Sequence, residues 1–114
     1  MTMPVDFKTQ YYRNVILADR IRNQLIEIYG GKCAQCGASK DEVHLEINHI
    51  YGRKWKVRTL NRYNRFLRYR KEAREGRINL LCKDCNAVWR PRREETAPGW
   101  CPLFEAWENG NRPF

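Results

Sequence analysis

Four cysteines form two Cys-x-x-Cys pairs, Cys33 with Cys36 and Cys82 with Cys85, on either side of a segment that contains His49. The two-residue gap lets both thiolates of a pair bind one ion, and two such pairs are typical of a structural zinc site. Bound zinc contributes an apparent ~10–16 kcal/mol in small zinc peptides, whereas a whole domain is stable by roughly 5–15 kcal/mol. We therefore expect that removing one of these cysteines unfolds the region around it.

Other uses of the cysteines remain open at this point. Disulfides are the rival cross-link in a small domain, and unrelated buried or free thiols are a further alternative. The fifth cysteine, Cys101, has no second cysteine at the same spacing and is interpreted as a free or packed thiol.

His49 and two asparagines stand where they could share a site with the cysteines. An imidazole can accept a proton from water at physiological pH, which makes His49 a candidate general base. Asparagine by itself favours turns and helix caps. Asn79 lies three residues before the second cysteine pair and Asn86 directly follows it, so their positions link them to the metal site. The other histidine, His44, is expected on the surface of a strand.

The positive charge of the chain is concentrated beside this site. The 114 residues carry a formal net charge of +9, and residues 53–77 contain 11 Lys or Arg against two Glu. A localised positive charge is typical of a protein that binds a polyanion such as nucleic acid, although a solvated helix face would look similar. The candidate phosphate-binding residues are Arg53, Lys54, Lys56, Arg58, Arg62, Arg65 and Arg68. Trp55, Tyr63 and Tyr69 could stack on bases but are more often core residues.

Hydrophobic periodicity predicts the elements that position these residues. Leu17, Ile21, Leu25 and Ile28 recur at helical spacing. The expected elements are helices over residues 9–29, 58–75 and 83–90 and strands over residues 43–50 and 77–81. Residues 91–114 are interrupted by Pro and Gly, with Trp100, Phe104 and Trp107 as possible packing anchors.

These elements predict one α+β domain over residues 1–114. It would comprise an N-terminal helix in 1–31, a metal-stapled core in 32–90 with a basic helical insertion at about 57–75, and an extension in 91–114. We see no apolar signal segment and no run long enough to cross a membrane, so an intracellular, cytoplasmic setting is expected. Paired Cys-x-x-Cys motifs in such a setting favour metal over disulfides.

The order of motifs resembles an HNH endonuclease of the ββα-metal superfamily. The resemblance rests on a Cys-x-x-Cys pair, then Leu-Glu-Ile-Asn-His-Ile at 45–50, then Asn-Leu-Leu-Cys-x-x-Cys-Asn at 79–86, and it covers about residues 33–90. It is similar in particular to zinc-stapled members, including phage junction-resolving nucleases, with Asn after the second pair. In that family two strands and a helix form the active site, and the cysteines clamp its ends.

The resemblance implies a role for each matching residue. His49 would be the general base, Asn79 would brace the loop between the strands, and Asn86 would bind a catalytic Mg²⁺ or Mn²⁺. Asn48 stands where the family usually has Asp or His as the other ligand of that ion. The implied reaction is hydrolysis of double-stranded or branched DNA to 5′-phosphate and 3′-hydroxyl ends, and a phage origin is in keeping with it.

Asn48 departs from the pattern, because Mg²⁺ prefers anionic oxygen ligands. Three interpretations remain open: weak metal binding, help from a nearby carboxylate such as Glu46 or Asp84, or an inactive protein. The 30 residues from His49 to Asn79 exceed the spacing of many HNH motifs, and we interpret the basic helix as an insertion that binds substrate. The sequence thus predicts a DNA endonuclease. The main alternative is an inactive zinc-containing module that binds nucleic acid, and a zinc adaptor for a protein partner is the third.

Overall fold

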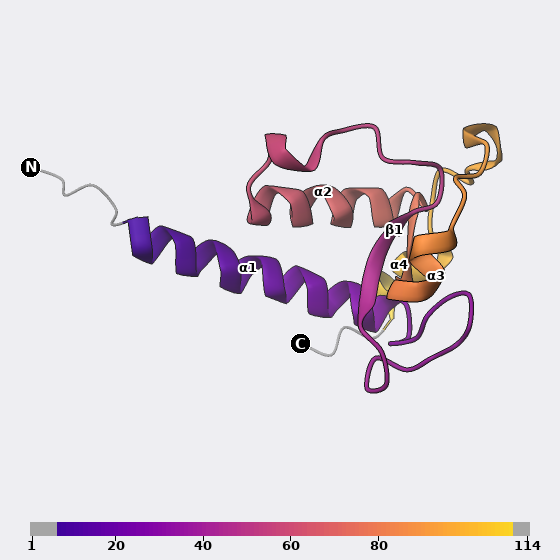
Figure 1. The fold of residues 1–114 in the computed structure, drawn as a ribbon, viewed down its shortest axis with the longest axis horizontal. Helices are drawn as coiled ribbons and strands as arrows, with labels where there is room; N and C mark the ends of the chain where they lie inside the picture. Colours follow the sequence, from indigo (N-terminus) through magenta and orange to yellow (C-terminus); the bar gives the residue numbers. More distant parts are fainter. Residues whose placement is uncertain (1–6, 111–114) are drawn as a thin grey trace, which may run out of the picture.

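The computed structural model describes residues 7–110 as an α+β fold of four α-helices and a two-stranded sheet (Figure 1). The helices are α1 (Phe7–Ile28), α2 (Arg62–Arg74), α3 (Lys83–Val88) and α4 (Pro102–Asn109). The strands are β1 (Leu45–His49) and β2 (Ile78–Cys82), and short 3-10 turns cover Val57–Thr59 and Glu94–Thr96. The α+β class expected from the sequence is confirmed.

Helix α1 forms the long side of the molecule, and α2 lies alongside its C-terminal half (Figure 1). The predicted apolar stripe of α1 faces inward, since Ile21, Leu25 and Ile28 are all buried. Leu25 and Ile28 pack in one cluster with Ile78 of β2 and Phe104 of α4. Ala73 of α2 belongs to the same cluster. Burial of a large apolar side chain contributes about 1.5–3 kcal/mol, so this cluster holds α1 and α2 against the sheet.

Helix α2 begins and ends at clear local signals. The Asn61 side chain caps its start by accepting a hydrogen bond from the backbone N–H of Asn64 at 2.8 Å. At the other end Gly76 adopts a positive φ of 71°, and Arg77 N–H donates to the Glu72 carbonyl in the Schellman pattern. Helix α2 therefore starts four residues after the predicted start at 58, because residues 57–59 form a 3-10 turn before the cap.

Strands β1 and β2 pair antiparallel, with Leu45 opposite Cys82, Asn48 opposite Asn79 and His49 opposite Ile78. Side chains alternate between the two faces of a strand, and directly opposite residues share a face. Leu45, Ile47 and His49 therefore share a face with Ile78 and Leu80, which belong to clusters packed against α1 and α2. Glu46, Asn48, Asn79 and Leu81 lie on the other face, where α3 packs.

Helix α4 was not predicted from the sequence. It begins with Pro102 in its first turn and buries Phe104, which is 1% exposed, against the main cluster. Of the three predicted anchors in this segment, Phe104 is buried, Trp107 is half-buried and packs against the same cluster, and Trp100 is exposed. In the part of the chain described, no helix is both long and apolar enough to span a bilayer.

Candidate functional site

The four paired cysteines converge on one point. Cys33 and Cys36 lie in the loop after α1, Cys82 ends β2 and Cys85 lies in the first turn of α3. All four Sγ atoms lie within 4.8 Å of one another, and those of Cys36 and Cys82 are 3.9 Å apart. Four sulfurs bound tetrahedrally at about 2.3 Å from a zinc ion would be separated by about 3.8 Å. The cluster can therefore hold a metal ion such as zinc, as the sequence predicted.

A backbone hydrogen bond to sulfur orients each Cys-x-x-Cys pair of this cluster. The N–H of Cys36 points to Cys33 Sγ and the N–H of Cys85 points to Cys82 Sγ, each at 3.5 Å. Burial opposes ionisation of Cys33, but the backbone N–H groups of Cys36 and Cys82 outweigh it and lower the pKa of Cys33 to about 6. Hydrogen bonding to Cys82 and burial raise the pKa of Cys85 to about 12. A bound cation would favour ionisation of all four thiols together.

Asn48 and Asn79, predicted as a metal ligand and a brace, form a pair across the sheet. The Asn48 Nδ2 group donates to Asn79 Oδ1 at 2.9 Å, and Asn48 is only 5% exposed. The pair satisfies polar groups that would be costly to bury alone. Both residues lie on the face of the sheet on which α3 packs.

Asn86, the other predicted metal ligand, lies on α3 beside a carboxylate. Its Nδ2 donates to Glu46 Oε1 at 2.9 Å. Glu46 precedes Asn48 by two residues on the same face of β1, so the structure gathers Glu46, Asn48, Asn79 and Asn86 on one side of the sheet. Glu46 is one of the two carboxylates that the sequence offered as substitutes for the missing acid. No hydrogen bond or ion pair joins Asp84 to this group in residues 7–110.

His49 lies on the opposite face, against α2. Both carboxylate oxygens of Glu72 are 3.3 Å from His49 Nε2, and Glu72 Oε1 also accepts from Trp55 Nε1 at 3.2 Å. The Trp55 and Tyr69 rings meet the imidazole edge-on, at 5.8 and 5.7 Å between ring centroids. The His49 side chain is 10% exposed. The structure therefore brings His49 together with Glu72 and not with the asparagines.

Six of the seven predicted phosphate-binding residues are exposed, and Arg65 is half-buried. Arg53, Lys54, Lys56 and Arg58 lie on the connection between β1 and α2, and Arg62, Arg65 and Arg68 lie on α2. Two of them carry partners that offset their charge. Lys54 pairs with Glu94, and Arg62 pairs with Asp19 at 2.9 Å. Arg53 and Arg68 lie over the Trp55 ring, where cation–π contact holds them near His49.

Sequence reasoning missed Glu72 and Arg22. Glu72 is one of two acids in the basic stretch, and it follows Phe66 and Tyr69 at three-residue steps on the inward face of α2. An acid on an apolar stripe needs a buried partner, and this signal could have identified it. Arg22 donates to the Leu45 carbonyl at 3.0 Å and lies 3.4 Å from His44 Nδ1. Nothing in the spacing of Arg22 indicated these contacts.

We compared the chain with family models, with curated proteins and with solved structures, and none of them matches it.

Proposed function

We propose that this protein is a metal-dependent DNA endonuclease of the HNH, or ββα-metal, type with His49 as general base. One observation carries the proposal: an antiparallel strand pair is followed at once by α3, and the cysteine cluster ties the start of that helix to the loop after α1. This is the order of elements that the resemblance implies. The cluster would hold a structural zinc ion, which would fix the end of β2 and the start of α3 relative to the loop after α1.

The surroundings of His49 suit a base that needs a defined tautomer. With Nε2–H donating to Glu72, the lone pair of Nδ1 is left to accept a proton from water. The hydrogen is assigned to His49 Nε2 because a carboxylate oxygen of Glu72 can only accept the hydrogen bond. Trp55 and Tyr69 meet the ring edge-on, and access for water and a phosphate would require that Trp55, on the 50–61 connection, move away from it.

A catalytic divalent ion fits best at Glu46 and Asn86. Glu46 supplies the anionic oxygen that Mg²⁺ prefers, and the Asn86 amide oxygen supplies a neutral one. Asn48, the ligand implied by the resemblance, is buried and bonded to Asn79. When bound, Mg²⁺ or Mn²⁺ neutralises charge on the phosphate and stabilises the leaving oxygen.

The basic residues beside the site account for the choice of DNA as substrate. Arg53, Lys56 and Arg58 are exposed, on the connection that follows β1, and no ion pair engages them in residues 7–110. Arginine and lysine side chains in such a position bind phosphates and fix the register of the duplex. Each phosphate that they neutralise adds about −0.9 to the slope of log K against log salt on duplex DNA.

The test is cleavage of a supercoiled plasmid by the zinc-loaded protein in Mg²⁺ or Mn²⁺. Nicking should occur with the wild type and be lost in His49→Ala. A matched His44→Ala control should retain it at a saturating protein concentration, because the proposal gives His44 no role in proton transfer. Glu46→Gln should raise the concentration of divalent ion needed for half-maximal nicking, because it removes the anionic oxygen of the proposed ion site.

The second candidate is a zinc-containing module that binds nucleic acid without cleaving it. The observation that favours it is the separation of His49 from Glu46 and Asn86 on opposite faces of the sheet. Tight DNA binding with no nicking in any divalent ion, by protein that carries its full zinc content, would establish this function instead.

A further inference from the structure

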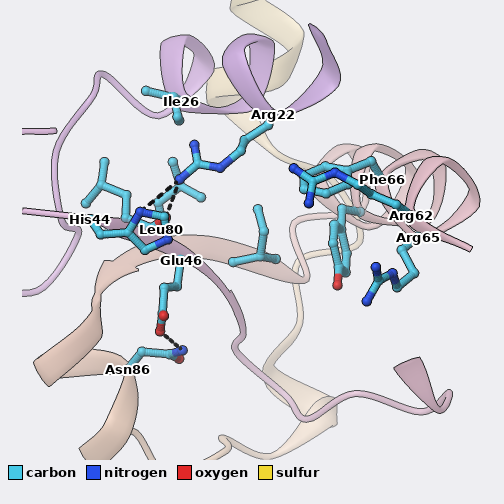
Figure 2. Close-up of a pocket in the computed structure, with 12 residues that line it drawn as sticks. Arg22, Ile26, His44, Glu46, Arg62, Arg65, Phe66, Leu80 and Asn86 are labelled. Carbon is cyan, nitrogen blue, oxygen red and sulfur yellow. Dashed lines mark hydrogen bonds between the residues drawn. The ribbon is translucent and has the colours of Figure 1, made fainter. Parts of the chain in front are cut away.

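A groove of about 320 Å³ runs between α1, α2 and the outer edge of β1 (Figure 2). Arg22 reaches it from α1, Arg62 and Arg65 reach it from α2, and His44 lies just before β1. Its far end is formed by the hydrogen-bonded pair of Glu46 and Asn86 (Figure 2). The groove therefore connects a basic cleft to the only oxygen-donor pair that the proposed function uses for its divalent ion.

The groove has an excess of positive charge, because three arginines line it and nearby carboxylates do not neutralise all of them. Among residues 7–110 no carboxylate pairs with Arg22, which donates to the Leu45 carbonyl at 3.0 Å and lies 3.4 Å from His44 Nδ1. Arg65 has a buried Nε–H with no hydrogen-bond acceptor among residues 7–110. A buried donor without an acceptor is costly, and an anionic oxygen is the strongest acceptor for a guanidinium. Of the described residues, Glu46, at the far end, is the single carboxylate that lines the groove.

Apolar side chains line part of the groove beside the arginines. Ile47, Phe66 and Tyr69 are among its lining residues, and Phe66 and Tyr69 are in edge-to-face contact with ring centroids 5.1 Å apart. Apolar and aromatic surface flanked by arginines is the combination that single nucleic-acid strands contact, with sugars or bases on the rings and phosphates on the cations. A peptide strand added to β1 fits less well, because Arg22 already occupies the Leu45 carbonyl at the start of that edge.

We propose that this groove binds the sugar–phosphate backbone of a DNA strand, with Arg22 and Arg65 on successive phosphates, and directs it to Glu46 and Asn86. The proposal rests on the proposed function for the identity of the ligand. Arg62 contributes at the exposed mouth, where Asp19 already pairs with it at 2.9 Å. Arg22, on the N-terminal helix, thereby joins a DNA surface that otherwise lies on residues 53–68.

The experiment measures binding of a fluorescently labelled duplex, and of its separate single strand, by anisotropy without added Mg²⁺ or Mn²⁺. Arg22→Gln and Arg65→Gln should each weaken Kd about tenfold. Each should also flatten the slope of log K against log salt by about 0.9 on duplex or 0.7 on a single strand. The matched controls are Arg20→Gln on α1 and Lys71→Gln on α2, both exposed and outside the groove. They should change Kd less than twofold.

Further variants separate this proposal from neighbouring ones. Arg22→Lys, which keeps the charge, should retain most of the affinity, and zinc content and circular dichroism confirm that each variant is folded. His49→Ala should bind as the wild type does, so loss of cleavage alone leaves the groove proposal intact. Equal losses in groove and control variants would overturn it, as would unchanged binding in the groove variants. Arg65-dependent binding of a polyglutamate peptide, with no binding of DNA, would assign the groove to an acidic protein partner instead.

Discussion

Replacement of Cys33 by Ser tests how far the fold depends on the cysteine cluster. The cluster is the point at which the loop after α1, the end of β2 and the start of α3 meet. A four-thiolate zinc site contributes an apparent ~10–16 kcal/mol, against roughly 5–15 kcal/mol for the stability of a whole domain. Because a hydroxyl binds zinc far more weakly than a thiolate, we expect Cys33→Ser to lose zinc and to unfold at least the sheet and α3.

Cys101→Ser is the matched control, because Cys101 is also buried, at 8% exposure, but lies in the cluster formed by α1, α2 and α4. Burying its hydroxyl should cost only about 1–3 kcal/mol and leave one zinc per chain. Metal analysis by mass spectrometry gives the zinc content, and guanidinium unfolding followed by circular dichroism gives the stability. If Cys33→Ser keeps one zinc per chain and unfolds at the same midpoint as Cys101→Ser, the proposed role of the cluster is wrong.

Four further predictions concern packing and charge. Glu72→Ala should destabilise the protein by about 2–3 kcal/mol, measured by chemical unfolding, since His49 and Trp55 lose their acceptor, and Glu72→Gln should recover part of that loss. Phe104→Ala should lower the free energy of unfolding by about 3–5 kcal/mol, and a loss below 1 kcal/mol would show that α4 is not part of the core. Gly76→Ala should cost more than Gly30→Ala in the same assay, because a Cβ at Gly76 would lie 2.5 Å from the Trp100 carbonyl whereas Gly30 faces open space at a similar positive φ. Hydrogen bonds from Lys54 and Arg77 lower the pKa of Glu94, so their contribution to stability is present above the pKa of the unfolded state, near 4.5, and is lost as the pH falls below it. The difference in Tm between wild type and Glu94→Gln should therefore vanish in acid, and a difference that persists there would contradict this account.

Strong local periodicity explains why most of the fold could be predicted. The stripe on α1 and the alternation in β1 have one dominant period each, and the predicted elements lie within a few residues of those observed. Helix α4 was missed because Pro and Gly surround a segment of only eight residues, and its helix is stabilised by burial of Phe104. The start of α2 was placed too early because the Asn61 cap was not recognised.

The candidate site was predicted less completely, for a reason that lies in the register of the sheet. The cysteine cluster follows from spacing alone, since two-residue gaps already restrict each pair. The partners of His49 do not, because Glu72 is distant in the chain and only the packing of α2 on β1 brings it near. Adjacent residues of a strand point to opposite faces, so Asn48 and His49 lie on opposite faces of β1, which conflicts with the single shared site expected from the sequence.

The most direct test of the central claim is whether the nicks made by this protein can be sealed by DNA ligase. We predict that zinc-loaded wild-type protein with Mg²⁺ or Mn²⁺ leaves 5′-phosphate and 3′-hydroxyl ends, so ligase restores covalently closed plasmid, and that His49→Ala makes no nicks. A folded protein that binds the plasmid and leaves it intact in every divalent ion would contradict the claim, as would nicking that survives the loss of His49.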